Sequence, residues 1–311
     1  MIFIEATSLI IINCLALLGN GFVFILAYRN RRRLTLTDVL IVALSSTDLL
    51  VAVTVMPLSH GVIIKGVWFY NQSLCRFQGF CIISFATASL NTLSVIAINR
   101  FYCVVKPNQY RTVFSTRNTI RFLIIVWIVT FSFSIPPLIS GADNYTFQPG
   151  KVLCLYPFEI NTAYTVSLDV AFIGVATVVI SFCYWRVYRR LRRRNCVMSE
   201  KAYRHSRKSV PTFSNVREAN ITKTAIVVEF GFALCWLPVL VIDAIDTATG
   251  SLTLPRQLYL FYTFMIFLSS AINPFIYALV SKRFKEELRK VINQVRPKSN
   301  LNETSPRLSE T

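Results

Sequence analysis

Two charged side chains stand inside or at the end of long apolar runs of this sequence, Asp48 and Arg100. Burying a lone carboxylate is costly, so Asp48 needs a cation, a proton or hydrogen-bond donors beside it. Arg100 keeps its charge and needs an acid or a lipid phosphate as its partner. Catalysis would need paired acid–base groups at membrane depth, but His60 ends an apolar run and His205 lies in a basic stretch. We therefore expect ion binding and reversible charge pairing, and not an enzyme.

Membrane-spanning helices would position these side chains. Hydrophobic residues make up 54% of the 311 positions and charged residues only 15%, whereas soluble domains carry about 25% charged residues. No basic residue precedes the first apolar run, which favours a retained span over a cleaved signal peptide. We expect Pro238 to break the sixth run. Seven runs are long enough to cross a bilayer, at about 4–28, 37–62, 72–105, 120–140, 161–189, 218–247 and 257–280.

The formal net charge of +18 is concentrated on one side of the proposed membrane. The 33 Lys and Arg residues lie in or beside the loops of that side, except Lys65, Arg76, Lys151 and Arg256. This bias is typical of the cytoplasmic face of a membrane protein, where the leaflet is anionic. We expect a multi-pass protein of the plasma membrane with its N-terminus outside, its C-terminus in the cytoplasm and no nucleic-acid partner.

The stretch after the last run has the pattern of a surface helix. Lys and Arg surround apolar residues at helical spacing, which is typical of a helix lying flat on membrane lipid. The apolar residues are Phe284, Leu288, Val291, Ile292 and Val295. We expect one seven-transmembrane domain over residues 1–292 and a disordered cytoplasmic tail over 293–311.

Short motifs, one set in each run, resemble the rhodopsin-like (class A) G-protein-coupled receptors over about residues 10–292. They are Gly19-Asn20, Leu44-Ser-Ser-Thr-Asp48, Cys75 with Asn99-Arg100-Phe101, Trp127, Tyr184, Phe232 with Cys235-Trp236-Leu237-Pro238, and Asn273-Pro274-Phe275-Ile276-Tyr277. The resemblance implies an all-α membrane protein, a seven-transmembrane helix bundle with a short amphipathic C-terminal helix on the inner leaflet. It also implies that an extracellular small-molecule or short-peptide ligand activates a heterotrimeric G protein, without a cofactor.

The alternative is a transporter or channel of seven spans. Such a protein would need a continuous polar path and commonly has an internal repeat. The sequence shows no repeat, and Asp48 is essentially the only charge near the middle of a run. We therefore favour the receptor.

The resemblance makes Arg100 the coupling residue, flanked by Asn99 and Phe101. The family usually carries an acid directly before this arginine, where the chain has Asn99. Glu218 stands at the family's second partner position, so our hypothesis is an Arg100–Glu218 pair that opens on activation. Arg100 and Tyr184 would then line a cleft for a helix of the G protein. The alternative is that Arg100 only reaches lipid phosphates.

In the family, an acid in the second span holds a sodium ion that favours the inactive state. The resemblance places this ion at Asp48, with Ser89, Ser269 and Asn273 as ligands and Asn20 close by. The alternative is a protonated, hydrogen-bonded Asp48 with no ion, and no other metal is expected. Bendable proline-containing helices would carry the switch residues, which are Phe232, Trp236, Pro238, Asn273, Pro274 and Tyr277.

Of the eight cysteines, Cys75 and Cys154 fall on the outer side, where oxidation is permitted. The resemblance implies a disulfide between them that holds the outer loop over the pocket. Asn71 and Asn144 begin outer sequons for N-glycosylation, and Asn71 lies close to the membrane.

Within the family, the chain looks most like the melatonin receptors. The likeness is carried by Ile96-Ala-Ile-Asn99-Arg100, Thr162-Ala-Tyr-Thr165 and Phe182-Cys-Tyr184. Where those receptors hold their ligand with Asn, Gln and His, this chain has Pro137, Phe158 and Phe172. We therefore expect a ligand other than melatonin.

The expected ligand pocket consists of Ile82, Asp169, Phe172, Trp236 and Asp243. Ile82 stands where amine receptors carry an Asp, and Phe267 stands where opsins carry the retinal Lys, which argues against both classes. Our hypothesis is that Asp169 and Asp243 bind a cationic group of the ligand. The alternative is that Asp243 and Asp246 are solvated acids near the outer surface.

Overall fold

The computed structural model consists mainly of long helices, and seven spans within its described residues are long and apolar enough to cross a membrane. It describes residues 2–139, 145–157, 162–205 and 213–295, without the side chains of residues 33, 162, 194–205, 213–220, 282–283 and 291–295. The expected seven-helix architecture is confirmed. The spans are α1 (Ile2–Arg29), α2 (Leu36–Thr54) with α3 (Met56–Lys65), α4 (Gln72–Val105), α6 (Thr116–Ser134) with α7 (Pro136–Ile139), α8 (Thr162–Leu168) with η2 (Asp169–Gly174) and α9 (Val175–His205), α10 (Phe213–Thr249), and α11 (Arg256–Val280).

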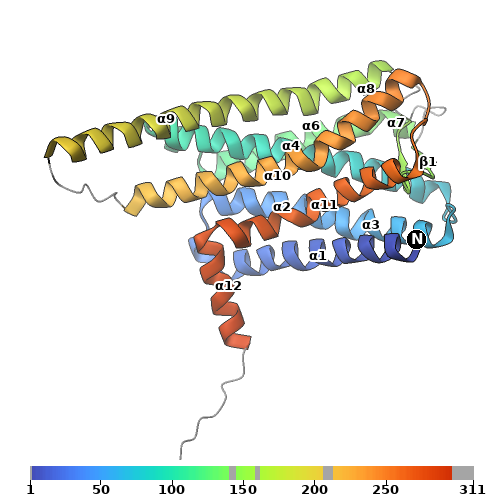
Figure 1. Ribbon diagram of the computed structural model, residues 1–311, viewed down its shortest axis with the longest axis horizontal. Coiled ribbons are helices and arrows are strands. Elements are labelled where there is room, and N and C mark those ends of the chain that lie inside the picture. The colour runs from blue at the N-terminus through green and yellow to red at the C-terminus, as the bar shows by residue number, and fades with distance from the viewer. Residues whose placement is uncertain (1, 140–144, 158–161, 206–212, 296–311) are drawn as a thin grey trace, which may run out of the picture.

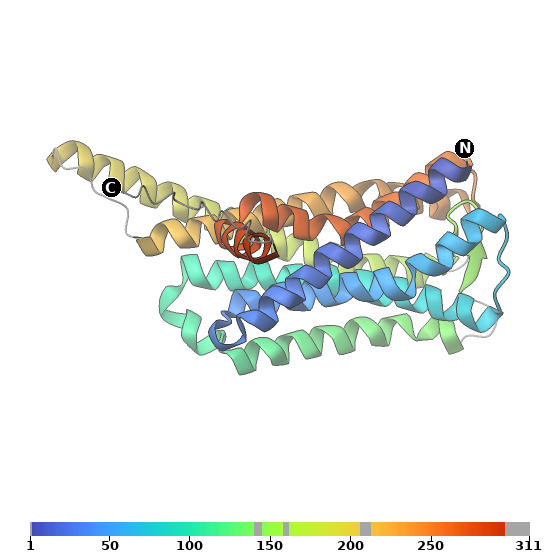
Figure 2. The ribbon, with the colours of Figure 1, turned by 90° about the horizontal axis from the view of Figure 1, so that it is seen from below.

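Helix α4 is the most buried span and the centre of the bundle. It packs against α2, α6, α9 and α10, while α1 packs against α2 and α11. Figures 1 and 2 show the spans running side by side along the long axis. The polar side chains of α4 therefore face other helices and not lipid, as buried polar groups in a membrane require. They include Ser84, Thr87, Ser89, Thr92 and Ser94.

Side chains at helix starts explain where several helices begin. Thr35 and Asp38 exchange hydrogen bonds in a capping box at the start of α2. The Asn71 side chain accepts a hydrogen bond from the Leu74 amide at 2.8 Å and so caps α4. Ser115 caps α6 in the same way. These caps satisfy amides that have no partner within their own helix.

Prolines interrupt the spans in places that differ from the prediction. The second span divides between Thr54 and Met56, where Pro57 stands in the first turn of α3. The predicted break at Pro238 is wrong, because α10 continues past it to Thr249. One missing amide need not end a helix whose flanking turns are packed, and α10 packs along α11.

The basic stretch between the fifth and sixth spans is helical over much of its length. The Arg, Lys and Ser residues from Arg192 to Arg217 predict a solvated loop, but α9 continues to His205 and α10 begins at Phe213. Arg and Lys are good helix formers, which accounts for the extension. Residues 206–212 lie outside the described part of the chain.

A small antiparallel hairpin covers the end of the bundle that carries the N-terminus (Figure 1). Its strands are β1 (Thr146–Gln148) and β2 (Leu153–Leu155), and Phe147 pairs with Cys154. β2 is fully buried and packs on α4. The tip of the hairpin is Gly150-Lys151, and the Lys151 side chain is buried.

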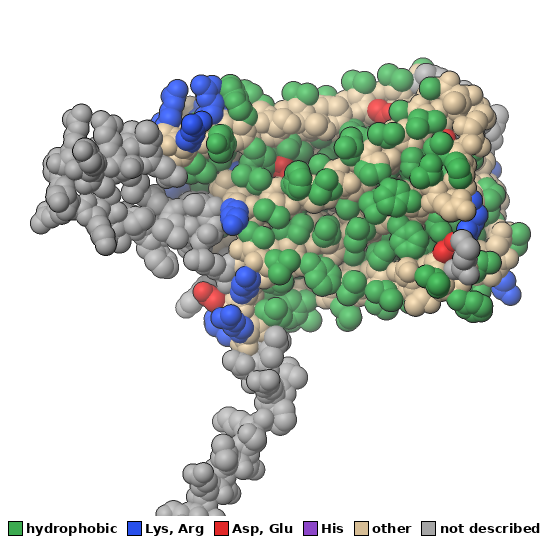
Figure 3. Space-filling view, viewed as in Figure 1, with side chains coloured by type: hydrophobic (Ala, Val, Ile, Leu, Met, Phe, Trp, Pro, Cys, Tyr) green, Lys and Arg blue, Asp and Glu red, His purple; other side chains and the backbone are tan. Residues whose placement is uncertain are grey.

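The opposite end of the bundle carries the short helices η1 (Arg31–Arg33) and α5 (Pro107–Val113), and α12 (Lys282–Val295) leaves the bundle there. Figure 1 shows α12 turned away from the direction of the spans. In Figure 3, apolar side chains cover the middle of the bundle, and most basic side chains in view lie at the α12 end. The domain boundary at residue 292 stays a prediction, since α12 continues to Val295 and residues 296–311 lie outside the description.

Candidate functional site

Asp48 is buried in α2 with 2% of its surface exposed. Its Oδ2 accepts a hydrogen bond from Asn273 Nδ2 of α11 at 2.9 Å. The Ser270 hydroxyl also lies in hydrogen-bonding position to this carboxylate, a partner that the sequence did not indicate. Asn20 Nδ2 donates to the Ser270 carbonyl oxygen at 2.9 Å and so braces α11 against α1. Three helices therefore meet around one carboxylate.

The other residues expected to bind sodium differ from one another in their hydrogen bonds. Ser89 is buried in α4, and its hydroxyl has no hydrogen-bond partner among the described residues. Ser269 donates its hydroxyl to the Ile266 carbonyl oxygen of its own helix at 2.7 Å. The Oδ1 atoms of Asn20 and Asn273 are also buried without a described partner. Oxygen donors of this kind suit a hard cation, so the donor types fit a sodium ion.

Arg100 lies at the inner end of α4 and is only 2% exposed. Its Nη2 donates to Thr37 Oγ1 of α2 at 2.8 Å and to Asn99 Oδ1. Asn99 Nδ2 donates to the Tyr110 hydroxyl at 3.4 Å. These contacts argue against a side chain that reaches out to lipid phosphates. The Glu218 side chain lies outside the described residues, so the Arg100–Glu218 pair stays a prediction.

A cleft of about 700 Å³ opens at this inner end, beside α1, α2, α10, α11 and α12. Arg100 and Tyr277 line it, and Asp38, Glu286 and Glu287 add acidic groups. Its volume lies within the range of about 300–1,000 Å³ that is usual for binding pockets. The buried arginine therefore faces a space in which a partner segment can bind.

Tyr184 lies in α9 and Phe101 packs against that helix, and neither of them lines this cleft. The Phe101 ring packs 6.2 Å from the Phe182 ring, measured between centroids. The Tyr184 hydroxyl lies beside the carboxyl of Glu229, which is 8% exposed within the sixth span. Asp48 is therefore not the only acid at membrane depth. The signal was present in the sequence as one glutamate in the apolar run VVEFGF.

Phe232 and Trp236 stack in α10, with centroids 5.5 Å apart and ring planes 19° apart. Trp236 lines a cavity in the outer half of the bundle. Phe232 belongs to the apolar core of the inner half, together with Leu93 and Tyr277. Pro238 follows within one turn. The stacked pair thus connects the outer cavity to the inner half of the bundle.

Gly19 in α1 and Pro274 in α11 lie in contact where these two helices pack together. A Cβ added at Gly19 would lie 2.9 Å from Pro274, so only glycine fits there. Farther along α11, the Tyr277 ring packs 6.1 Å from Phe284 of α12, between centroids. The last two switch residues therefore lie at contacts between helices.

The outer cavity has a volume of about 60 Å³. Ile82, Asp169, Trp236 and Asp243 line it, as expected for the pocket. Phe172 does not line it, because its ring packs 4.8 Å from the Phe133 ring. The volume is small beside the roughly 300 Å³ of the smallest usual ligand pockets. This conformation therefore holds the pocket nearly closed.

Asp243 and Asp246 are not solvated, which corrects the alternative considered for them. Lys151 Nζ, at the hairpin tip, lies 3.1 Å from Asp243 Oδ1 and 3.0 Å from Asp246 Oδ2. The side-chain exposure is 1% for Lys151, 14% for Asp243 and 0% for Asp246. The hairpin therefore places Lys151 in contact with two acids of α10 that are distant from it in the sequence.

Comparison with known proteins decides the class of this bundle. The family described as "7 transmembrane receptor (rhodopsin family)" matches residues 19–277. The chain belongs to this receptor family. Its members are multi-pass receptors of the plasma membrane.

The expected likeness to melatonin receptors is confirmed. The receptor is 27% identical to melatonin receptor type 1A of Ovis aries, over 92% of this chain and 76% of that protein. It is 28% identical to melatonin receptor type 1B-B of Danio rerio, over 94% of this chain and 83% of that protein. It is also 25% identical to octopamine receptor beta-1R of Drosophila melanogaster, over 96% of this chain and 63% of that protein.

The fold of the receptor is similar to that of squid rhodopsin. The TM-score is 0.81, and the match covers 94% of this chain and 86% of that chain. The identity is 22%, so this likeness shows the fold alone.

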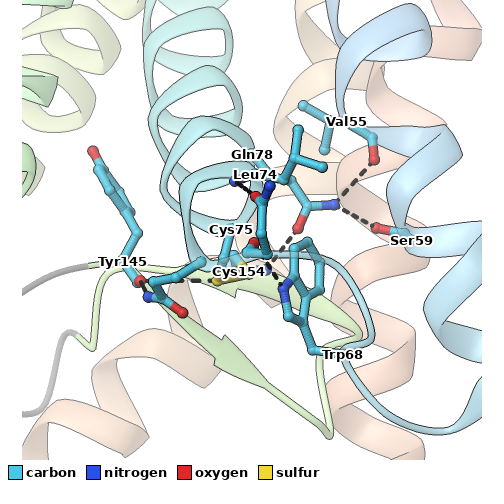
Figure 4. The surroundings of a disulfide bond; sticks show 10 residues. Val55, Ser59, Trp68, Leu74, Cys75, Gln78, Tyr145 and Cys154 are labelled. Atoms are coloured by element: carbon cyan, nitrogen blue, oxygen red, sulfur yellow. Dashed lines mark hydrogen bonds between the residues drawn. A yellow bond between two sulfur atoms is a disulfide. The ribbon is translucent and has the colours of Figure 1, made fainter.

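The receptor contains the expected disulfide between Cys75 and Cys154 (Figure 4). Gln78, one turn from Cys75 and fully buried, supports the same loop, because its Oε1 accepts a hydrogen bond from the Cys154 amide at 2.9 Å. Its Nε2 donates to the Val55 carbonyl oxygen and to Ser59 Oγ, both at 3.1 Å. The sequence did not single out Gln78, since its hydrogen bonds join three segments that are distant in the sequence.

Of the two predicted glycosylation sequons, the structure describes the asparagine of one, Asn71. The Asn71 side chain caps α4, and the backbone carbonyl oxygen of Asn71 accepts a hydrogen bond from Trp68 Nε1 at 3.3 Å. Asn144 lies outside the described residues. Glycosylation of either asparagine stays a prediction.

Proposed function

We propose that this receptor converts the binding of an extracellular ligand into the activation of a heterotrimeric G protein. One observation carries the proposal. Arg100, with Tyr277 nearby, faces the inner cleft, while the Phe232–Trp236 stack connects the outer cavity to the inner half. A ligand that moves Trp236 would shift α10 and thereby change the shape of the cleft. Asn99 holds the Arg100 guanidinium in place.

For the ligand we propose a small molecule or short peptide with a cationic group. The relatives are named for melatonin and octopamine, but the chain lacks the Asn, Gln and His expected of a melatonin site. Asp169 and Asp243 make the cavity wall acidic, whereas Ile82 and Ile266 make the rest apolar. An apolar pocket with a few polar groups is usual for small ligands.

We also propose that a sodium ion binds at Asp48 and favours the resting form, with Ser89, Asn273 and Ser269 as further oxygen ligands. The ion would supply a positive charge to a buried carboxylate. The residues of this chain would position that carboxylate through the Asn273 and Ser270 hydrogen bonds.

The orientation that we propose has the hairpin and N-terminus outside and α12 on the inner leaflet. The charge bias supports it, as do the basic side chains at the α12 end in Figure 3. The arginine cleft then faces the cytoplasm, where G proteins reside.

The test is a G-protein dissociation assay in cells that display the receptor. The ligand panel includes melatonin, small amines, nucleosides and short peptides. We expect at least one amine to give a response that Arg100→Ala abolishes and Arg117→Ala, at an exposed site on α6, retains. An equal response in the Arg100→Ala receptor would contradict the coupling role.

A transporter has less support than a receptor. The outer cavity and inner cleft share no lining residue in the described part of the chain, so they do not form one path. Net flux of a substrate across sealed vesicles would be the evidence for it.

A further inference from the structure

The hairpin tip reaches a site that is built to hold an ammonium group. The Lys151 Nζ lies between two carboxylates, Asp243 and Asp246, at 3.1 and 3.0 Å. It also lies 4.5 Å from the centroid of the Tyr262 ring and 5.5 Å from that of Tyr259. Carboxylates together with aromatic faces are the usual means by which proteins recognise ammonium ions. We call Asp243, Asp246, Tyr259 and Tyr262 the acid–tyrosine cage.

The two tyrosines also fix the carboxylates of the cage. Tyr262 donates its hydroxyl to Asp243 Oδ2 at 3.1 Å, and Tyr259 donates to Asp246 Oδ1 at 2.6 Å. The cage is therefore rigid on the side of α10 and α11 and does not depend on the hairpin for its shape. Rigid, preoriented groups of this kind bind with little cost in ordering.

Lys151 does not balance the cage that it occupies. Two carboxylates face one ammonium, and the contact from Lys151 Nζ to Asp246 Oδ2 at 3.0 Å is an ion pair that lacks hydrogen-bond geometry. Buried charges need good geometry to recover the cost of leaving water. A second cation, or an ammonium in better geometry, would therefore be favoured here.

The hairpin tip is closely fitted but strained. The Lys151 carbonyl oxygen accepts a hydrogen bond from Thr263, and a Cβ at Gly150 would lie 2.8 Å from the Tyr259 ring. The next residue, Val152, has a φ of +55°, which is unfavourable for a β-branched side chain. Withdrawal of Lys151 would let this residue relax.

The cage opens onto the outer cavity. Asp243 and Tyr262 belong to both, and Asp169 lies on the wall of the same cavity. A ligand in the cavity therefore meets the inner side of the cage directly.

We propose that the acid–tyrosine cage is a subsite for the ammonium group of a small ligand, and that Lys151 occupies this subsite and closes the cavity until the ligand displaces it. This inference rests on the proposed receptor function and names the ligand chemistry of its pocket. It makes the receptor's own lysine a competitor of the ligand.

The test measures access to the cavity and does not need signalling. Ala86, on the cavity wall, is replaced by cysteine in the full-length receptor in membranes. The labelling rates of this thiol by 2-aminoethyl and 2-sulfonatoethyl methanethiosulfonate are compared, after subtraction of the rate without Ala86→Cys. Lys151→Gln is expected to speed the cationic reagent by about tenfold or more, and the anionic reagent much less.

The controls separate the subsite from general loosening. Lys65→Gln changes an exposed lysine at the end of α3 and is expected to leave both rates unchanged. Adding Asp243→Asn and Asp246→Asn to Lys151→Gln should remove the preference for the cationic reagent. In Lys151→Gln, 2-phenylethylamine should slow labelling, whereas the neutral 2-phenylethanol should not.

Three results would overturn the proposal: equal labelling with and without Lys151, equal acceleration of both reagents, or no protection by the amine. If Lys151→Gln fails to reach the surface, the charge-compensated pair Lys151→Gln with Asp246→Asn is measured instead, with the same acceleration expected. Because labelling does not depend on coupling, failure here leaves the G-protein proposal standing, and a silent G-protein assay leaves the labelling result intact.

Discussion

The oxygen atoms around a buried carboxyl decide what it can bind. Asp48 has two hydrogen-bond donors, and several amide and hydroxyl oxygens with no described donor are buried on α1, α4 and α11. Glu229 has the single hydroxyl of Tyr184 beside it. A hard cation needs several oxygen ligands, so Asp48 is suited to hold one and Glu229 is not.

The proposed sodium site therefore predicts a salt-specific gain in stability. Replacing N-methylglucamine chloride by sodium chloride at equal ionic strength should raise the melting temperature of the purified receptor. The gain is about 1–3 kcal/mol for sodium at roughly 10 to 100 times its dissociation constant. Asp48→Asn should abolish the sodium response, whereas Glu5→Gln at the outer end of α1 should keep it. If sodium does not raise the melting temperature of the unsubstituted receptor, the result would support the alternative of a protonated Asp48 without an ion.

At the scale of helices, the contact between Gly19 of α1 and Pro274 of α11 depends on one missing methyl group. Gly19 lets the Pro274 ring pack against the α1 backbone, and Asn20 then reaches the Ser270 carbonyl oxygen. Gly21, two residues along, has open space where its Cβ would be. The two glycines therefore form a natural pair for comparison.

Gly19→Ala should destabilise the receptor by about 1–3 kcal/mol, because the new methyl group forces the two helices apart. Gly21→Ala should be neutral or stabilising by up to about 1 kcal/mol, because alanine favours the helix. Thermal unfolding in one detergent measures both. Equal effects of the two substitutions would show that the α1–α11 contact is loose.

The sequence predicted the spans well but not the places where they bend. Long apolar runs specify helices whatever surrounds them, whereas Pro57 and Pro238 look alike in sequence and differ only in their packing. The same dependence on packing explains why the ion pairs of Lys151 were not predicted. Asp243 was correctly placed on the cavity, but its pairing with Lys151 depends on how the hairpin folds over α10 and α11. Contacts between distant segments produce no periodic pattern in the amino-acid sequence, so the sequence does not predict them.

For the whole molecule, the charge bias and the hairpin define the two ends of the bundle. N-glycans are added only on the outer side, so they report which end is outside. The Asn71 side chain is engaged as the cap of a membrane span, whereas the Asn144 sequon lies in the sequence segment that we propose to be an outer loop.

We expect Asn144→Gln to remove the mobility shift that glycosidase treatment produces, and Asn71→Gln to leave that shift in place. Asn71→Gln should still lower stability by about 1 kcal/mol through the lost cap. Gel mobility before and after glycosidase measures the first effect. A receptor with no glycan at Asn144 and modification at Asn302 instead would reverse the proposed orientation.

Gln78 has a consequence for biosynthesis. Its side-chain amide binds the backbone amide of Cys154 and the backbone carbonyl oxygen of Val55, and neither contact requires oxidised sulfur. The nascent hairpin can therefore be aligned on α4 while all thiols are still reduced. Cys75 lies on one side of Gln78 and the buried free thiol of Cys81 on the other. This contact with the Cys154 backbone would favour pairing of Cys154 with Cys75 before an oxidant acts.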